Sequence, residues 1–189
     1  VRGRQLPWHH AESQEEKVRN DMANLMYALS APVFVRILRN LEGVLDKGAA
    51  HAAARKIDPA VLVGARLFPD MFPLSTQVRI ACDFAKGAVA RLTGNEPPKH
   101  EDNEVTFDDL KARIAKTIAY VEGFGPEQFE GADARTVTMK MRGEDKSFDG
   151  VTYLANIVLP NFYFHVTTAY DILRHNGVEL GKRDFIGPI

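Results

Sequence analysis

Apolar residues recur at helical spacing along several long segments of this chain. In the first of these segments, Val33, Ile37, Leu41 and Leu45 lie four positions apart. This spacing places one broad apolar face along an α-helix. The sequence therefore predicts an amphipathic helix over residues 32–56, and the proline at its start suits the first helical turn.

Three further segments have the same periodicity. They predict helices over residues 74–92, 106–123 and 149–176. Pro160 falls inside the last segment, where it should kink the helix or split it in two because proline lacks the backbone N–H. A very short crossover helix is predicted to begin at Pro59.

Residues 135–148 differ from the rest of the chain. Val137, Met139 and Met141 alternate with polar residues, and a polar turn sequence begins at Gly143. Two interpretations fit this pattern equally well: a short β-hairpin, or an extended lid over one end of the bundle. Because no other region shows this alternation, we expect an all-α four-helix bundle, with the hairpin as an option before the last helix.

The bulk composition excludes some classes of function. The chain has 189 residues, a net charge of −1 and no long apolar run, so we expect one domain that binds neither nucleic acid nor membrane. Cys82 is the only cysteine, which excludes an intrachain disulfide and favours a reducing, cytoplasmic location.

The first residues of the chain are polar and only weakly periodic. Met22 then opens the sequence MANLMYALSAP, which is typical of a native start. We therefore interpret residues 1–21 as a non-native or flexible N-terminal extension and residues 22–189 as a single domain. His9 and His10 lie in the extension, where a non-functional tail is favoured over a metal-binding pair.

Two short sequences carry a resemblance to a known family. PDMFPL at residues 69–74 and PNFYFH at residues 160–165, with their flanking helices, resemble a bacterial domain-of-unknown-function family of the DinB-like (YfiT-like) four-helix-bundle superfamily. The resemblance covers Met22 to Ile189. It implies an up-down-down-up bundle that forms a homodimer. Relatives often bind a divalent metal through three histidines, and some are thiol transferases or maleylpyruvate isomerase-like enzymes.

The resemblance also implies where such a metal site would lie. The two histidines of the last helix correspond to Asn161 and His165, and the histidine of the second helix corresponds to Gln77. This chain therefore keeps one imidazole and has two amides, which are weak neutral donors that would hold zinc poorly. We expect no cofactor, and a divalent metal such as Zn or Ni is the alternative.

Several polar residues are candidates for a ligand pocket. His165 lies on the apolar stripe of the last helix, either in such a pocket or as a core histidine bonded to neighbouring polar groups. Asn161 either edges the pocket or repairs the backbone at Pro160, and Asp70 either points into it or caps the second helix. The candidates are His165, Asn161, Gln77, Thr168, Tyr163, Tyr170 and Asp70.

The sequence contains no nucleophile elbow, glycine-rich phosphate loop or CxxC pair. It therefore identifies no catalytic residues and does not show whether the protein is an enzyme. Three hypotheses for the function follow. The first is a small-molecule-binding bundle with a pocket around His165 and a degenerate metal site. The second is a non-catalytic, dimeric structural or stress-related protein. The third is a metal-dependent transferase with an altered ligand set.

Overall fold

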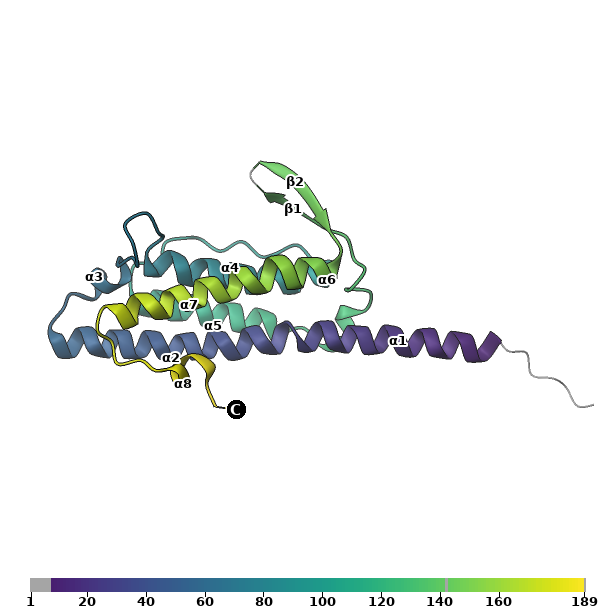
Figure 1. The fold of residues 1–189 in the computed structure, drawn as a ribbon, viewed down its shortest axis with the longest axis horizontal. Helices are drawn as coiled ribbons and strands as arrows, with labels where there is room; N and C mark the ends of the chain where they lie inside the picture. The colour runs from purple at the N-terminus through teal and green to yellow at the C-terminus, as the bar shows by residue number, and fades with distance from the viewer. Residues whose placement is uncertain (1–7, 142, 189) are drawn as a thin grey trace, which may run out of the picture.

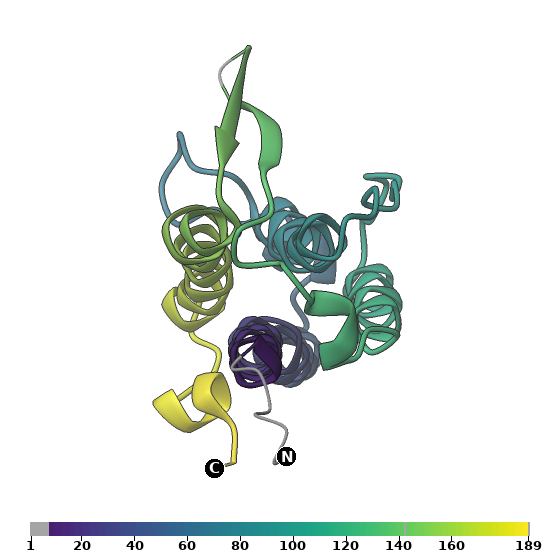
Figure 2. The same ribbon diagram turned by 90° about the vertical axis from the view of Figure 1, so that its right-hand side faces the viewer.

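Helices make up most of this computed structural model, which describes residues 8–141 and 143–188, with side chains from Gln14 onward. Seen end-on in Figure 2, four long helices surround a common core, with α4 opposite α2 and with α5 and α7 between them. Their bounds are α2 Ala31–Arg55, α4 Leu74–Leu92, α5 Phe107–Val121 and α7 Leu159–His175. None of the helices in the described residues is long and apolar enough to cross a membrane.

The four helices follow an up-down-down-up order. In Figure 1, α2 and α7 run in one direction and α4 and α5 run in the other. The short helix α3 (Pro59–Val63) turns the chain from α2 into α4. The loop of residues 93–106 returns along the bundle, so α5 starts at the same end as α4. The predicted fold is confirmed.

The ends of the helices follow local sequence chemistry. Thr106 and Asp109 form a reciprocal capping box at the start of α5, so two otherwise unpaired N–H groups are satisfied. Lys56 ends α2 in the left-handed conformation, with a φ of 55°. Ser30 holds the N-cap position of α2 but does not cap it, because its hydroxyl donates to the carbonyl of Met26 at 2.6 Å.

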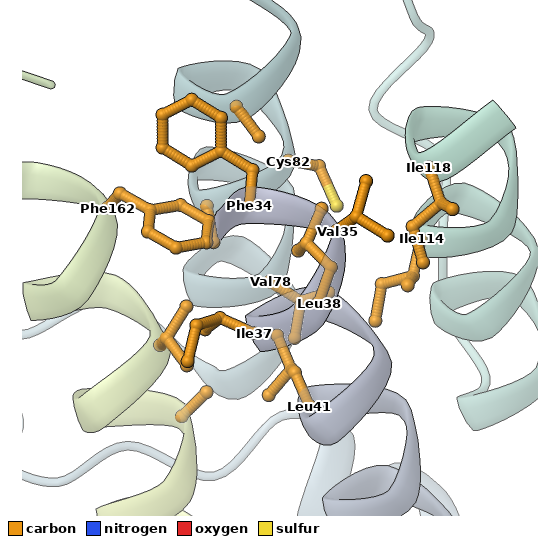
Figure 3. Packing of buried hydrophobic residues seen from close by; sticks show 14 of the residues in the cluster. Phe34, Val35, Ile37, Leu38, Leu41, Val78, Cys82, Ile114, Ile118 and Phe162 are labelled. Atoms are coloured by element: carbon orange, nitrogen blue, oxygen red, sulfur yellow. The ribbon is translucent and has the colours of Figure 1, made fainter. Parts of the chain in front are cut away.

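The core lies along the axis of the bundle, where all four helices contribute apolar side chains (Figure 3). The rings of Phe34 on α2 and Phe162 on α7 meet edge to face, with their centroids 4.9 Å apart. Leu38, Val78 and Ile114 are fully buried beside them. Each such side chain contributes about 1.5–3 kcal/mol on burial, so this shared core stabilises the packing of all four helices.

Helix α1 (Trp8–Ala28) extends beyond the bundle at the end where α2 begins (Figure 1). Its last turns are anchored by Met26, which is buried, and by the ring of Tyr27, 5.6 Å from that of Phe129 in the 3₁₀ helix η1 (Pro126–Phe129). The helix runs across the boundary expected at Met22, so that boundary stays a prediction. Residues 1–7 and the side chains of His9 and His10 lie outside the described part of the chain.

A two-stranded antiparallel hairpin precedes the last helix. It consists of β1 (Val137–Met141) and β2 (Glu144–Phe148), and it projects from the bundle in Figures 1 and 2. Gly143, in the turn, has a φ of 89°, a conformation that glycine adopts at little cost. Of the two interpretations that the sequence left open, the hairpin is confirmed.

The last helical segment changes its hydrogen-bonding pattern along its length, but the residues at each junction keep right-handed helical backbone angles, so the segment is not split in two and the predicted kink stays a prediction. It starts with a single turn, α6 (Gly150–Thr152), continues as the π-helical segment η2 (Tyr153–Val158), and becomes α7 at Leu159. Pro160 is the second residue of α7, so its missing N–H falls where the helix changes from π-helical to α-helical bonding. After α7, the short helix α8 (Lys182–Ile186) packs on α2, where Asn40 donates to the carbonyl of Phe185 at 3.0 Å.

Candidate functional site

His165 on α7 and Gln77 on α4 form a hydrogen-bonded pair between two neighbouring helices. The Nδ1 of His165 lies 2.6 Å from the Oε1 of Gln77. Both side chains are buried, with exposed fractions of 8% and 1%. The amide nitrogen of Gln77 in turn donates to the backbone carbonyl of Phe72 at 3.0 Å. The loop before α4 therefore orients Gln77, and Gln77 orients the imidazole.

This arrangement fixes the protonation of the imidazole ring. Because the amide nitrogen of Gln77 faces a carbonyl, its oxygen must face His165, and only a protonated Nδ1 can donate to that oxygen. Burial also lowers the pKa of His165 below its usual value of 6.5, which favours the neutral ring. The neutral tautomer with Nδ1–H carries its lone pair on Nε2.

Aromatic rings surround the imidazole of His165. The ring of Phe84 stacks on it at a centroid distance of 6.2 Å, and the ring of Phe164 meets it edge-on at 5.3 Å. Phe164 and Phe72 are exposed, by 55% and 56%. Five surface pockets of the described residues lie elsewhere, and none of these five is lined by His165 or Gln77. The pair therefore lies beside the exposed ring of Phe164.

Asn161 and Thr168, expected to edge a pocket with His165, both bond to their own helix. The side-chain nitrogen of Asn161 donates to the carbonyl of Ile157 at 2.6 Å, and the hydroxyl of Thr168 donates to the carbonyl of Phe164 at 2.7 Å. The first bond agrees with the interpretation that Asn161 repairs the backbone near Pro160. Neither side chain is brought into a hydrogen bond with His165 in the described residues.

The other candidates lie apart from the pair. Tyr163 packs edge-on against Phe162 at 5.6 Å, and Tyr170 packs against Phe185 of α8 at 6.0 Å. Asp70 is exposed in the loop before α4. Its capping role is not observed, because Pro73 holds the N-cap position of α4 and no side chain caps that helix.

The residues at the three family positions do not fit a divalent metal. The oxygen of Gln77 is engaged by the imidazole of His165, and the amide of Asn161 is bonded to its own helix. Only the Nε2 of His165 is free to coordinate a metal ion, and zinc requires three or four protein ligands. Among the described residues, no group of three or more histidine, cysteine, aspartate or glutamate side chains is placed to hold a metal ion.

Sequence analysis missed a buried ion network between α4, α5 and the loop before α5. The guanidinium of Arg113 contacts Glu104 at 2.8 Å, Asp102 at 3.0 Å and Asp83 at 2.8 Å. Burial alone would raise the pKa of Glu104, but the hydrogen bond and charge of Arg113 and the charge of Arg79 outweigh it and hold that pKa below its ordinary value. The periodicity of the sequence does not reveal this network, because its acidic members lie on α4 and in a loop without a periodic pattern.

Cys82 lies within this part of the core and is fully buried. Burial raises the pKa of its thiol to about 12. The thiolate is the reactive form, so Cys82 is a packing residue and not a nucleophile.

Comparisons with known proteins agree with this architecture. Residues 26–186 match the model of a protein family described as a domain of unknown function, DUF1993. The chain is also similar to the crystal structure of a DinB family member protein from Shewanella denitrificans, with 43% sequence identity and a TM-score of 0.84 over 90% of this chain and 96% of that chain. No curated protein matches this chain.

Proposed function

We propose that this chain, which belongs to the DUF1993 family of DinB-like helical bundles, binds a small molecule at His165 without using a metal ion. The observation that carries the proposal is the series of hydrogen bonds from the carbonyl of Phe72 through Gln77 to the Nδ1 of His165. It presents the Nε2 lone pair as a hydrogen-bond acceptor.

The Nε2 nitrogen leaves His165 able to bind a ligand. Within the described residues, the Nε2 of His165 has no hydrogen-bond partner. It is also not among the fully buried unpaired atoms of the structure, so it is in contact with solvent. Because water can bond this nitrogen, leaving it without a protein partner carries little desolvation cost, and a hydrogen-bond donor of a ligand can replace the water there. Here one nitrogen is fixed and the other is left open.

The surroundings indicate what kind of molecule would bind. A neutral imidazole in a partly dry, aromatic environment accepts a hydrogen bond from a hydroxyl or an amine N–H. The ring of Phe164, which meets the imidazole edge-on, offers exposed apolar surface beside it. A molecule with an apolar body and one hydrogen-bond donor therefore matches the site.

A thermal-shift screen of small molecules tests this proposal. Compounds that bind at Nε2 should raise the melting temperature of the wild-type protein and lose that effect in His165→Leu. The matched control is His175→Leu, because His175 is exposed at the end of α7. Compounds that stabilise His165→Leu as much as the wild type would refute binding at this residue.

The second candidate function is that of a non-catalytic, dimeric structural or stress-related protein. It is favoured by the exposure of Phe68, Phe72 and Phe164, which are 64%, 56% and 55% exposed. Aromatic side chains are enriched where proteins contact one another. Light scattering of the wild type and of the double variant Phe68→Ser and Phe164→Ser tests it, and a dimer that persists in the variant would place the interface elsewhere.

The third candidate, a metal-dependent transferase with an altered ligand set, has the least support, because the donors do not converge. Elemental analysis of the purified protein and of His165→Ala separates it from the others. Stoichiometric metal in the wild type and none in the variant would favour the transferase.

A further inference from the structure

A groove on the opposite side of α2 from α4 has chemistry unlike that of the His165 site. It lies where α1 meets α2, and the C-terminal end of α5 and the segment after α8 complete its walls. Its volume is about 560 Å³, which falls within the range of small-molecule sites.

The floor and walls of the groove are mainly apolar. Val35 and Val121 are buried beneath it, and Tyr27, Pro32 and Pro188 line its sides. Tyr27 is held in place by its edge-on contact with Phe129. The groove therefore offers a fixed apolar surface for a hydrocarbon or aromatic group, which gains about 25 cal/mol per Å² of apolar area removed from water.

The polar groups of the groove are mainly cationic. Arg36 and Arg39 both line it and lie one turn apart on α2. Glu122 is the one acidic residue among the lining residues, and it pairs with Arg39. Arg36 forms no ion pair within the part of the chain whose side chains are described. The lining therefore carries a net positive charge beside an apolar floor.

From this combination we propose that the groove binds a small organic carboxylate. The guanidinium groups of Arg36 and Arg39 would hold the carboxylate, because their planar N–H forks match its two oxygens. The hydrocarbon body would lie on Val35 and Val121 against the ring of Tyr27. Glu122 is then a competitor for Arg39, which limits how tightly the carboxylate binds.

Titration of the full chain with 2-naphthoate tests this proposal, with neutral 2-naphthamide as the matched probe. The backbone amide signals of the wild type should shift around Tyr27, Val35 and Val121 with 2-naphthoate, and binding of 2-naphthamide should be at least about tenfold weaker. Equal affinity of the two probes, measured from the shifts of these groove residues, would overturn the role of the arginines. Shifts confined to other residues would overturn the location.

Variants of exposed residues, which leave the core intact, sharpen the test. Arg36→Gln should weaken 2-naphthoate binding about tenfold, whereas Glu122→Gln should strengthen it severalfold because Arg39 is released. Arg174→Gln, at the exposed end of α7, and His165→Leu should leave it unchanged. The proposal fails if Arg36→Gln binds like the wild type, or if Glu122→Gln binds more weakly. Because His165 is not in this groove, either outcome is independent of the proposal for His165.

Discussion

The Oε1 of Gln77 lies 2.6 Å from the Nδ1 of His165, so a residue on α4 decides which tautomer of the imidazole is present on α7. The glutamine is itself held by the carbonyl of Phe72. The two helices are packed by the apolar core, and this polar contact depends on that packing being correct. The pair therefore links the protonation state of one side chain to the tertiary structure of the bundle.

Replacing Gln77 with glutamate should raise the pKa of His165. In the wild type, burial holds this pKa below 6.5. A carboxylate beside Nδ1 would stabilise the imidazolium by its charge, so His165 should titrate above the wild-type value by at least about one pH unit. Proton–nitrogen NMR of the imidazole measures this directly, with the exposed His175 as an internal control. An unchanged titration of His165 would mean that the two side chains are not in contact in solution.

The free energy of unfolding should fall as the pH is lowered from 7.5 to 5.5. The pKa values of His165 and His100 both lie below 6.5, in each case chiefly because of burial. The unfolded chain therefore binds protons more readily than the folded chain in this range, and stability present above about pH 6.5 is lost as the pH falls towards the folded pKa values. Carboxylates with lowered pKa values, such as Glu104, also stabilise the folded state, and this stabilisation is lost only at lower pH.

Urea denaturation at the two pH values measures this effect. The double variant His165→Gln and His100→Gln should show a smaller difference between pH 7.5 and pH 5.5 than the wild type. A wild-type stability that rises between pH 7.5 and pH 5.5 would contradict the prediction, because it would require histidines that bind protons more tightly in the folded state.

The fold could be predicted from sequence because its determinants are local. The spacing of Val78, Ala81, Ala85 and Val89 defines the buried face of α4, and the helix spans the predicted residues 74–92. Pro160 was expected to disturb the last helix by removing one N–H, and a π-helical segment lies directly before α7. Exposure was harder to predict. Phe68 and Phe72 are large apolar residues in the connection before α4, yet both are largely exposed.

The candidate site was predicted in part, because its contacts are tertiary. His165 follows from the apolar stripe, and Gln77 was named as its partner only through the family resemblance. The local bonds of Asn161 and Thr168 to their own helix compete with any contact to His165, and helical spacing does not reveal which contact forms. Arg113 was missed because its partners lie on α4 and in a loop that bears no periodic signal.

Replacing Arg113 with methionine should destabilise the protein by about 3–5 kcal/mol, because Glu104 would remain buried without its partner. Adding Glu104→Gln should recover part of the loss by removing the unpaired charge. Denaturant unfolding of the two variants measures both effects. The matched control is Lys111→Met, whose pairs with Asp46 and Asp108 are largely exposed and should contribute less than about 1 kcal/mol. Equal losses from Arg113→Met and Lys111→Met would show that burial of the network has no energetic consequence.

Gly150 and Gly43 should respond in opposite directions to substitution by alanine. A Cβ atom at Gly150 would lie 1.7 Å from the carbonyl oxygen of Ala132, so the start of α6 would have to move. Gly150→Ala should therefore lower the free energy of unfolding by about 1–3 kcal/mol or more. At Gly43, within α2, no atom lies within 4 Å of the added Cβ. Gly43→Ala should therefore raise the free energy of unfolding by about 0.5–1 kcal/mol, because alanine loses less backbone entropy than glycine when a helix forms. Thermal or denaturant unfolding of the two variants compares them directly.

If Gly150→Ala were as stable as the wild type, the segment before α7 would not approach Ala132 as closely as described, and the connection between the hairpin and the last helix would have to be revised.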